Sequence, residues 1–286
     1  MTCTTALAAY PDVVDWFTDR HTFLLAVAVY GISMIYSVFL WRKGFRRDDR
    51  VNYLLLLGAF ALHTVAMFQR GFSLNRCPVN NLFEATLFLA WAFALASLVV
   101  GLLPRLRFIG AFAAPVLFII GVFALMPALD PPHGPKPQFT GSLVSLHAAL
   151  ILLAYGAFGL ASVAAAMFLT EQHDLKFHKL RAVLSLLPPI QRLETIATRL
   201  VLVGFVLLTL GLLAGAQLPR PEGIGYWSDV KVKWSALLWT LYVGLLIARW
   251  RFSQSGRNFA WGVAGIFIFL LLTFWGTNLL STLHHP

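Results

Sequence analysis

The sequence predicts an all-α protein: one polytopic membrane bundle of about eight transmembrane helices. Of its 286 residues, 59% are hydrophobic and only 12% are charged, so a water-soluble globule of this length could not bury its apolar surface. The apolar residues recur in stretches long enough to cross a bilayer, and short charged or Pro- and Gly-rich segments separate them. Helices are the expected spanning element, because a β-barrel would show alternating segments of about ten residues.

These apolar stretches predict spans at residues 23–41, 51–68, 82–103, 108–126, 142–170, 196–217, 234–250 and 260–281. Between them, residues 127–141 are rich in Pro and Gly and predict an outer loop. Residues 171–194 are charged and predict an amphipathic connector on the inner surface. Residues 1–22 are acidic and lack a basic n-region, so we expect the first span to remain as an anchor. We therefore predict one integral membrane domain over residues 1–286.

The Lys and Arg residues predict the orientation, because cytoplasmic loops of membrane proteins carry an excess of positive charge. Fourteen fall on the predicted inner side: Arg42, Lys43, Arg46, Arg47, Arg50, Arg105, Arg107, Lys176, Lys179, Arg181, Arg192, Arg249, Arg251 and Arg257. Seven fall on the other side: Arg20, Arg70, Arg76, Lys136, Arg220, Lys231 and Lys233. Both termini are therefore expected outside. The net charge of +10 is divided among loops, which favours contact with the lipid bilayer and gives no indication of nucleic-acid binding.

Two of the eight histidines are predicted at similar depth on the outer side. His147 lies about one and a half turns into the span 142–170, and His284 lies at the outer end of the last span. Neutral imidazole is a usual axial ligand of haem iron. The alternatives are a hydrogen bond between helices or an interfacial side chain for His147, and a frayed tail for His284. Their shared side and depth favour a pair of haem ligands.

The predicted outer loop 218–233 and the residue after it read LPRPEGIGYWSDVKVKW. Tyr226, Trp227 and Trp234 offer flat faces for stacking on a porphyrin. Lys231 is one of several cations on this side that suit the two haem propionates. The alternative is an aromatic belt at the membrane interface, which needs no ligand.

Several stretches resemble the cytochrome c assembly membrane protein family, which includes CcsA and HemX-like haem-handling proteins. They are NRCPVNNLFEATLFLAW at 75–91, SLHAALILLAYGAF at 145–158, GYWSDVKVKW at 225–234 and FWGTNLLSTLH at 274–284. The resemblance covers roughly residues 52–286 in the family's order. It implies that His147 and His284 are the two outer haem ligands. It also implies that the tryptophan-rich "WWD" loop binds haem through Trp227, Asp229, Lys231 and Trp234, beside Tyr226.

The loop and one helix depart from the family's pattern. The first Trp of the loop has no counterpart, and Val230 and Val232 stand where the family has Pro and Glu. A transmembrane histidine of the full synthases falls on Ile247, which cannot bind iron. His63 lies roughly 8 Å deep in the second span, at about 1.5 Å per residue, too shallow to replace it. His63 either has a function of its own or pairs with a neighbouring helix.

The resemblance implies a haem-binding protein of cytochrome c biogenesis in the bacterial inner (cytoplasmic) membrane. It would hold haem b at the periplasmic, outer face for attachment to the CxxCH motif of apocytochrome c, beside a ResB-type membrane subunit. The chain would then be a component of a cytochrome c haem lyase or synthase.

Two alternatives remain open. One is a HemX-type membrane regulator of haem synthesis that acts by protein contact, and the other is a structural or transport subunit. Glu84, near the outer end of the third span, either caps its helix or pairs with Arg70 or Arg76.

Overall fold

The computed structural model describes residues 18–42, 49–74, 81–130, 142–177, 190–218, 229–251 and 255–280. Within these ranges the regular structure is entirely helical, which confirms the predicted all-α class. The α-helices are α1 (Asp19–Arg42), α2 (Arg50–Leu74), α3 (Leu82–Gly101), α4 (Ile109–Ala124), α5 (Ser142–Phe177), α7 (Ile190–Ala216), α8 (Val230–Arg251) and α9 (Gly256–Leu280). Two short 3-10 turns, η1 (Pro104–Leu106) and η2 (Pro127–Leu129), flank α4.

Seven of these helices are long and apolar enough to cross a bilayer, so the chain is a multi-pass membrane protein. The remaining helix, α4, has 16 residues. At about 1.5 Å per residue it is shorter than the hydrocarbon core of roughly 30 Å. The flanking 3-10 turns begin at Pro104 and Pro127, where proline's fixed φ suits the first turn of a helix. The predicted span 108–126 therefore contains a helix, but a shorter one than a full span.

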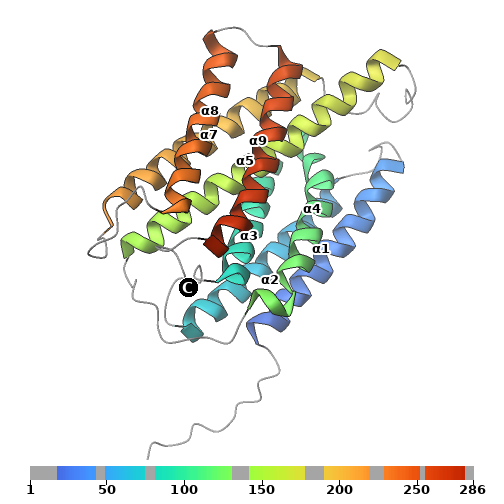
Figure 1. Cartoon of the computed structure of the whole chain (residues 1–286). Coiled ribbons are helices and arrows are strands. Elements are labelled where there is room, and N and C mark those ends of the chain that lie inside the picture. The colour runs from blue at the N-terminus through green and yellow to red at the C-terminus, as the bar shows by residue number, and fades with distance from the viewer. Residues whose placement is uncertain are drawn as a thin grey trace, which may run out of the picture.

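Figure 1 shows helices that run alternately in opposite directions, so that the start of α1 and the end of α9 lie toward the same, lower end of the bundle. We call this the outer end, following the distribution of Lys and Arg. Helices α1 to α4 pack on one another in one half, and α5 packs on α3, α7 and α9. The strongly tilted helix α5 thus joins the two halves, and its closest partner is α7.

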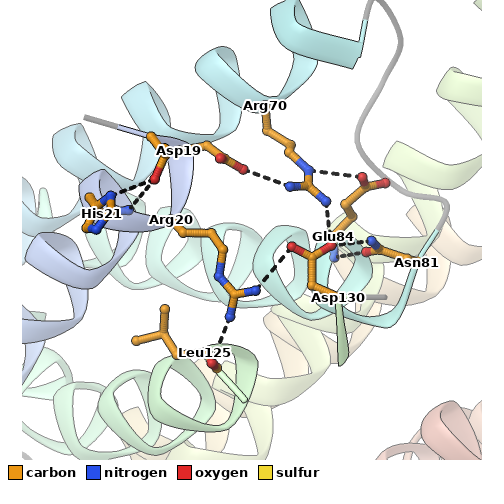
Figure 2. A network of polar contacts seen from close by, with 9 residues as sticks. Asp19, Arg20, His21, Arg70, Asn81, Glu84, Leu125 and Asp130 are labelled. Carbon is orange, nitrogen blue, oxygen red and sulfur yellow. Dashed lines mark hydrogen bonds and ion pairs between the residues drawn. The ribbon is translucent and has the colours of Figure 1, made fainter. Parts of the chain in front are cut away.

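A buried ion network joins the outer ends of α1, α2, α3 and η2 (Figure 2). Arg70, in the last turns of α2, donates hydrogen bonds to Asp19 at 3.0 Å, Glu84 at 3.1 Å and Asp130 at 2.6 Å. The side chains of Arg70 and Asp130 are each only 6% exposed, and that of Glu84 is fully buried. One guanidinium therefore links carboxylates from three other parts of the chain, and the predicted pairing of Glu84 with Arg70 is confirmed.

Two further side chains complete this network. Arg20 donates to Asp130 at 3.3 Å and to the Leu125 carbonyl oxygen at 2.9 Å. Asn81 donates to Asp130 at 2.7 Å, and its side-chain oxygen accepts from the backbone N–H of Glu84 at 2.7 Å. Asn81 is thus the N-cap of α3. Capping was one of the two roles expected for Glu84, and Asn81 has that role instead.

We predict that Arg70→Gln strongly destabilises the protein, because it leaves buried carboxylates without their guanidinium. Removing one partner of a buried pair typically costs about 3–5 kcal/mol. The measurement is the apparent midpoint of thermal unfolding in detergent. Arg251→Gln, at the exposed end of α8, is the control and should change stability by no more than about 0.5 kcal/mol. Equal midpoints for the two variants would contradict the structural role of Arg70.

Candidate functional site

Helix α7 meets α5 through glycines that allow a close approach. A Cβ added at Gly204 would lie 2.6 Å from the ring of Phe158, and one added at Gly211 would lie 2.7 Å from Ile151. Both distances are shorter than side chains tolerate. Small residues at such positions let the backbones of membrane helices approach each other closely. The glycine face of α7 therefore sets how near α5 can lie.

The same face contacts His147, which lies five residues after the start of α5 at Ser142. A Cβ at Gly215 would lie 2.6 Å from Cε1 and 2.7 Å from Nδ1 of the imidazole. His147 Nδ1 lies 2.7 Å from the carbonyl oxygen of Gly211. The imidazole is thus held between one glycine that supplies an acceptor and another that leaves space.

This hydrogen bond fixes the tautomer of His147. A carbonyl oxygen can only accept, so Nδ1 carries the proton and Nε2 carries the lone pair of the neutral ring. Among the described residues Nε2 makes no hydrogen bond. Histidines that bind metals usually donate their other N–H to a carbonyl or carboxylate in this way. The interhelical bond expected as an alternative role is therefore present, and it leaves His147 suited to bind iron through Nε2.

The start of α8 lies beside this imidazole. Asp229 is fully buried, and its Oδ1 accepts hydrogen bonds from the backbone N–H groups of Lys231 at 2.7 Å and Val232 at 3.2 Å. Asp229 is therefore the N-cap of α8. Lys231, in the first turn of this helix, is half-buried. Figure 1 shows the outer ends of α5, α7 and α8 close together at the lower left.

The predicted loop 218–233 extends too far, because α8 already begins at Val230. The N-cap formed by Asp229 starts this helix before the apolar pattern of the span begins. Trp234, expected to offer a face to a porphyrin, lies in the second turn of α8, and its ring centroid is 5.2 Å from that of Phe269 on α9. Its indole therefore contributes to packing between α8 and α9. Tyr226, Trp227 and His284 lie outside the described residues.

The buried histidine of α2 has a different role. His63 is fully buried, and its Nδ1 lies 3.3 Å from the Tyr30 hydroxyl on α1 while its Nε2 lies 3.1 Å from the Leu87 carbonyl oxygen on α3. Nε2 therefore donates to the carbonyl, and Nδ1 accepts from the tyrosine. Because both nitrogens are engaged, His63 has the predicted role of pairing helices.

The position of the family's transmembrane ligand does not point into the bundle. Ile247 on α8 is 49% exposed, so in a bilayer its side chain faces lipid or another protein. Within the described ranges, no group of three or more His, Cys, Asp or Glu side chains could hold a metal ion. Ile247 therefore supplies no iron ligand at the position of the family's transmembrane histidine.

Sequence reasoning missed the two residues of α7 that hold His147. The available signal was the pair Gly211 and Gly215, four residues apart in a helix otherwise rich in Leu and Val. Glycine is unfavourable inside helices, so two on one face indicate a close contact. Which side chain they contact depends on the rotation of α5 against α7, and the sequence does not give that rotation.

Together these features define a multi-pass α-helical membrane protein with a metal-competent imidazole at the outer end of its bundle. Residues 79–285 match the model of the family described as cytochrome c assembly protein. The chain belongs to this family, and the predicted resemblance is confirmed.

Similar proteins carry two different names. The chain is 27% identical to the cytochrome c biogenesis protein CcsA of Prochlorococcus marinus strain MIT 9303, over 90% of each chain. It is also 27% identical to protein HemX of Brevibacillus brevis, over 95% of this chain and 98% of that protein. Protein HemX of Bacillus subtilis is 26% identical over 90% of this chain and 94% of its own length. These matches extend over nearly the whole chain.

We predict that Asp229→Ala destabilises the start of α8 by about 0.5–2 kcal/mol, the usual cost of losing a side-chain N-cap. Asp229→Asn should retain most of the stability, because its amide oxygen can accept the same two backbone hydrogen bonds. Hydrogen exchange of residues 230–234 reports the effect directly. If Asn behaved like Ala, the carboxylate charge and not the cap would be the important feature.

Proposed function

We propose that this protein binds haem b at its outer face and holds it for attachment to apocytochrome c. His147 and His284 are the axial ligands in this proposal. The observation that carries it is the hydrogen bond from His147 Nδ1 to the Gly211 carbonyl oxygen, which leaves Nε2 as an electron-pair donor. Membership of the cytochrome c assembly family supports haem as the group that is bound.

The neighbouring residues fit the chemistry of haem. Lys231, in the first turn of α8, brings a positive charge to the outer end of the bundle, where it suits a propionate. The Asp229 carboxylate already caps the N-terminus of α8, so the anion-binding group at this end of the helix is the Lys231 ammonium. The site therefore offers an iron ligand and an anion-binding group from two different helices.

The register of α5 against α9 supports the second ligand. Tyr155 on α5 and Phe274 on α9 have ring centroids 5.9 Å apart. His147 lies eight residues toward the outer end from Tyr155, and His284 follows ten residues after Phe274 in the sequence. Similar lengths of chain therefore separate the two histidines from this contact between α5 and α9.

In the proposed reaction this chain binds, orients and shields. Haem supplies two vinyl groups, and each cysteine thiol of a reduced CxxCH peptide adds across one of them, forming a C–S bond as its proton moves to the other vinyl carbon. His147 and His284 fix the ring, and Lys231 holds the propionate edge, so that the vinyl edge stays accessible. The peptide's own histidine then replaces one protein ligand, and this exchange allows release.

This function places the outer end of the bundle at the periplasmic face of a bacterial inner membrane. It also requires reduced apocytochrome c as a partner. We propose a ResB-type membrane subunit as the second component. Together the two subunits would form a haem lyase or synthase.

We predict that the protein purified from membranes has a b-type visible spectrum, and that His147→Ala and His284→Ala each remove most of the bound haem. The pyridine haemochrome assay, expressed per folded protein, gives the haem content. His63→Ala is the matched control, because it also deletes an imidazole but one whose nitrogens are both engaged between helices. It should lower stability and leave the haem content unchanged. A wild type without haem, or unchanged spectra in the two ligand variants, would overturn the assignment.

A second function is favoured by two observations. Ile247 faces away from the bundle, and proteins named HemX match over nearly the whole chain. The protein would then be a membrane regulator of haem synthesis that acts by protein contact. Deletion of the gene separates the two: loss of holocytochromes c supports assembly, whereas altered abundance of haem-synthetic enzymes with normal cytochromes c supports regulation.

A further inference from the structure

Helix α7 meets the imidazole of His147 through two glycines with different contributions. Gly211 supplies a carbonyl oxygen 2.7 Å from Nδ1. Gly215 supplies space, since a Cβ there would lie 2.6 Å from Cε1 and 2.7 Å from Nδ1 but 3.4 Å from Nε2. The contact is thus tightest along the edge of the ring that carries the donated proton.

We propose that Gly211 and Gly215 are positioning residues that set the tautomer and ligand strength of His147. This inference rests on the proposed function for its chemical meaning, but the tautomer itself is a property of the protein without haem. Any side chain at Gly215 must displace the Nδ1 edge of the ring and lengthen its bond to Gly211. Without that bond, nothing described in the structure keeps the proton on Nδ1.

The tautomer decides whether His147 can bind iron as presented. Protonation on Nδ1 leaves the Nε2 lone pair free, whereas protonation on Nε2 blocks it. A hydrogen bond from Nδ1–H to a carbonyl also makes the imidazole a more basic ligand. A more basic ligand stabilises ferric iron relative to ferrous iron, so the intact contact should lower the midpoint potential of bound haem.

Gly211 and Gly215 also form a GxxxG pair, which by itself favours close helix packing. A purely structural role must therefore be separated from positioning. Gly204 provides the matched control on the same face of α7. A Cβ there would lie 2.6 Å from Phe158, so Gly204→Ala crowds the same helix pair to the same degree without touching His147. Gly244→Ala, where nothing lies within 4 Å, controls for the substitution itself.

The test is ¹⁵N NMR of histidine-labelled, haem-free protein in lipid, at a pH where imidazoles are neutral. The signals of His147 are assigned by their loss in His147→Ala. Wild type and Gly204→Ala should show a protonated Nδ1 and an unprotonated Nε2 at His147. Gly215→Ala should shift the population toward the Nε2–H tautomer. A wild-type His147 protonated on Nε2, or identical tautomers in Gly215→Ala and Gly204→Ala, would overturn the inference.

Haem-loaded protein provides the second readout. The midpoint potential of Gly215→Ala should shift upward relative to both wild type and Gly204→Ala, and the two alanine variants should have similar unfolding midpoints. The two proposals fail in different ways. Absence of haem from the wild type contradicts the proposed function, whereas an unaltered tautomer in Gly215→Ala contradicts the positioning role whether or not haem is bound.

Discussion

The close approach of α7 to α5 is the constraint on which the outer site depends. Glycines on one face of α7 bring its backbone against Ile151, Phe158 and His147. At the outer end this approach places the Gly211 carbonyl oxygen within hydrogen-bond distance of His147. With a larger separation the imidazole would have no partner on α7, and its tautomer would be unspecified. The glycines of α7 thus determine both the packing of α7 on α5 and the hydrogen bond that sets the tautomer of His147.

Ion pairs at opposite ends of the bundle restrain the helices around this contact. At the outer end, Arg70 holds carboxylates of α1, α3 and η2 in a buried network. Toward the inner end, Arg249 of α8 donates to Glu194 of α7, and its guanidinium lies over the ring of Phe259 on α9. Buried charges are costly unless paired, so these contacts favour one arrangement of the helices. That arrangement leaves His147 of α5 and Lys231 of α8 at the same, outer end of the bundle.

The sequence predicted features that follow from local pattern. Hydropathy predicts the helices and places His147 near the start of α5, and the Lys and Arg residues predict that this is the outer end. The contacts between helices could not be predicted from the sequence, because they depend on how each helix is rotated about its axis. Glu84 could be assigned an arginine partner, but the joining of Asp19 and Asp130 to the same guanidinium could not be foreseen. The sequence likewise does not identify Tyr30 and Leu87 as the hydrogen-bond partners of His63. The hydropathy pattern predicts the start of α8 too late, because the residues after the Asp229 N-cap include two lysines and resemble a loop in composition.

In the proposed function, His147 and His284 would both bind one haem iron, His147 through Nε2. Electron paramagnetic resonance of the purified ferric protein tests it most directly, because the signal reports the number and kind of axial ligands. The account predicts a low-spin spectrum typical of two imidazoles, which changes to high-spin when either histidine is replaced. A wild-type high-spin spectrum, or a low-spin spectrum that survives the loss of His147, would contradict it.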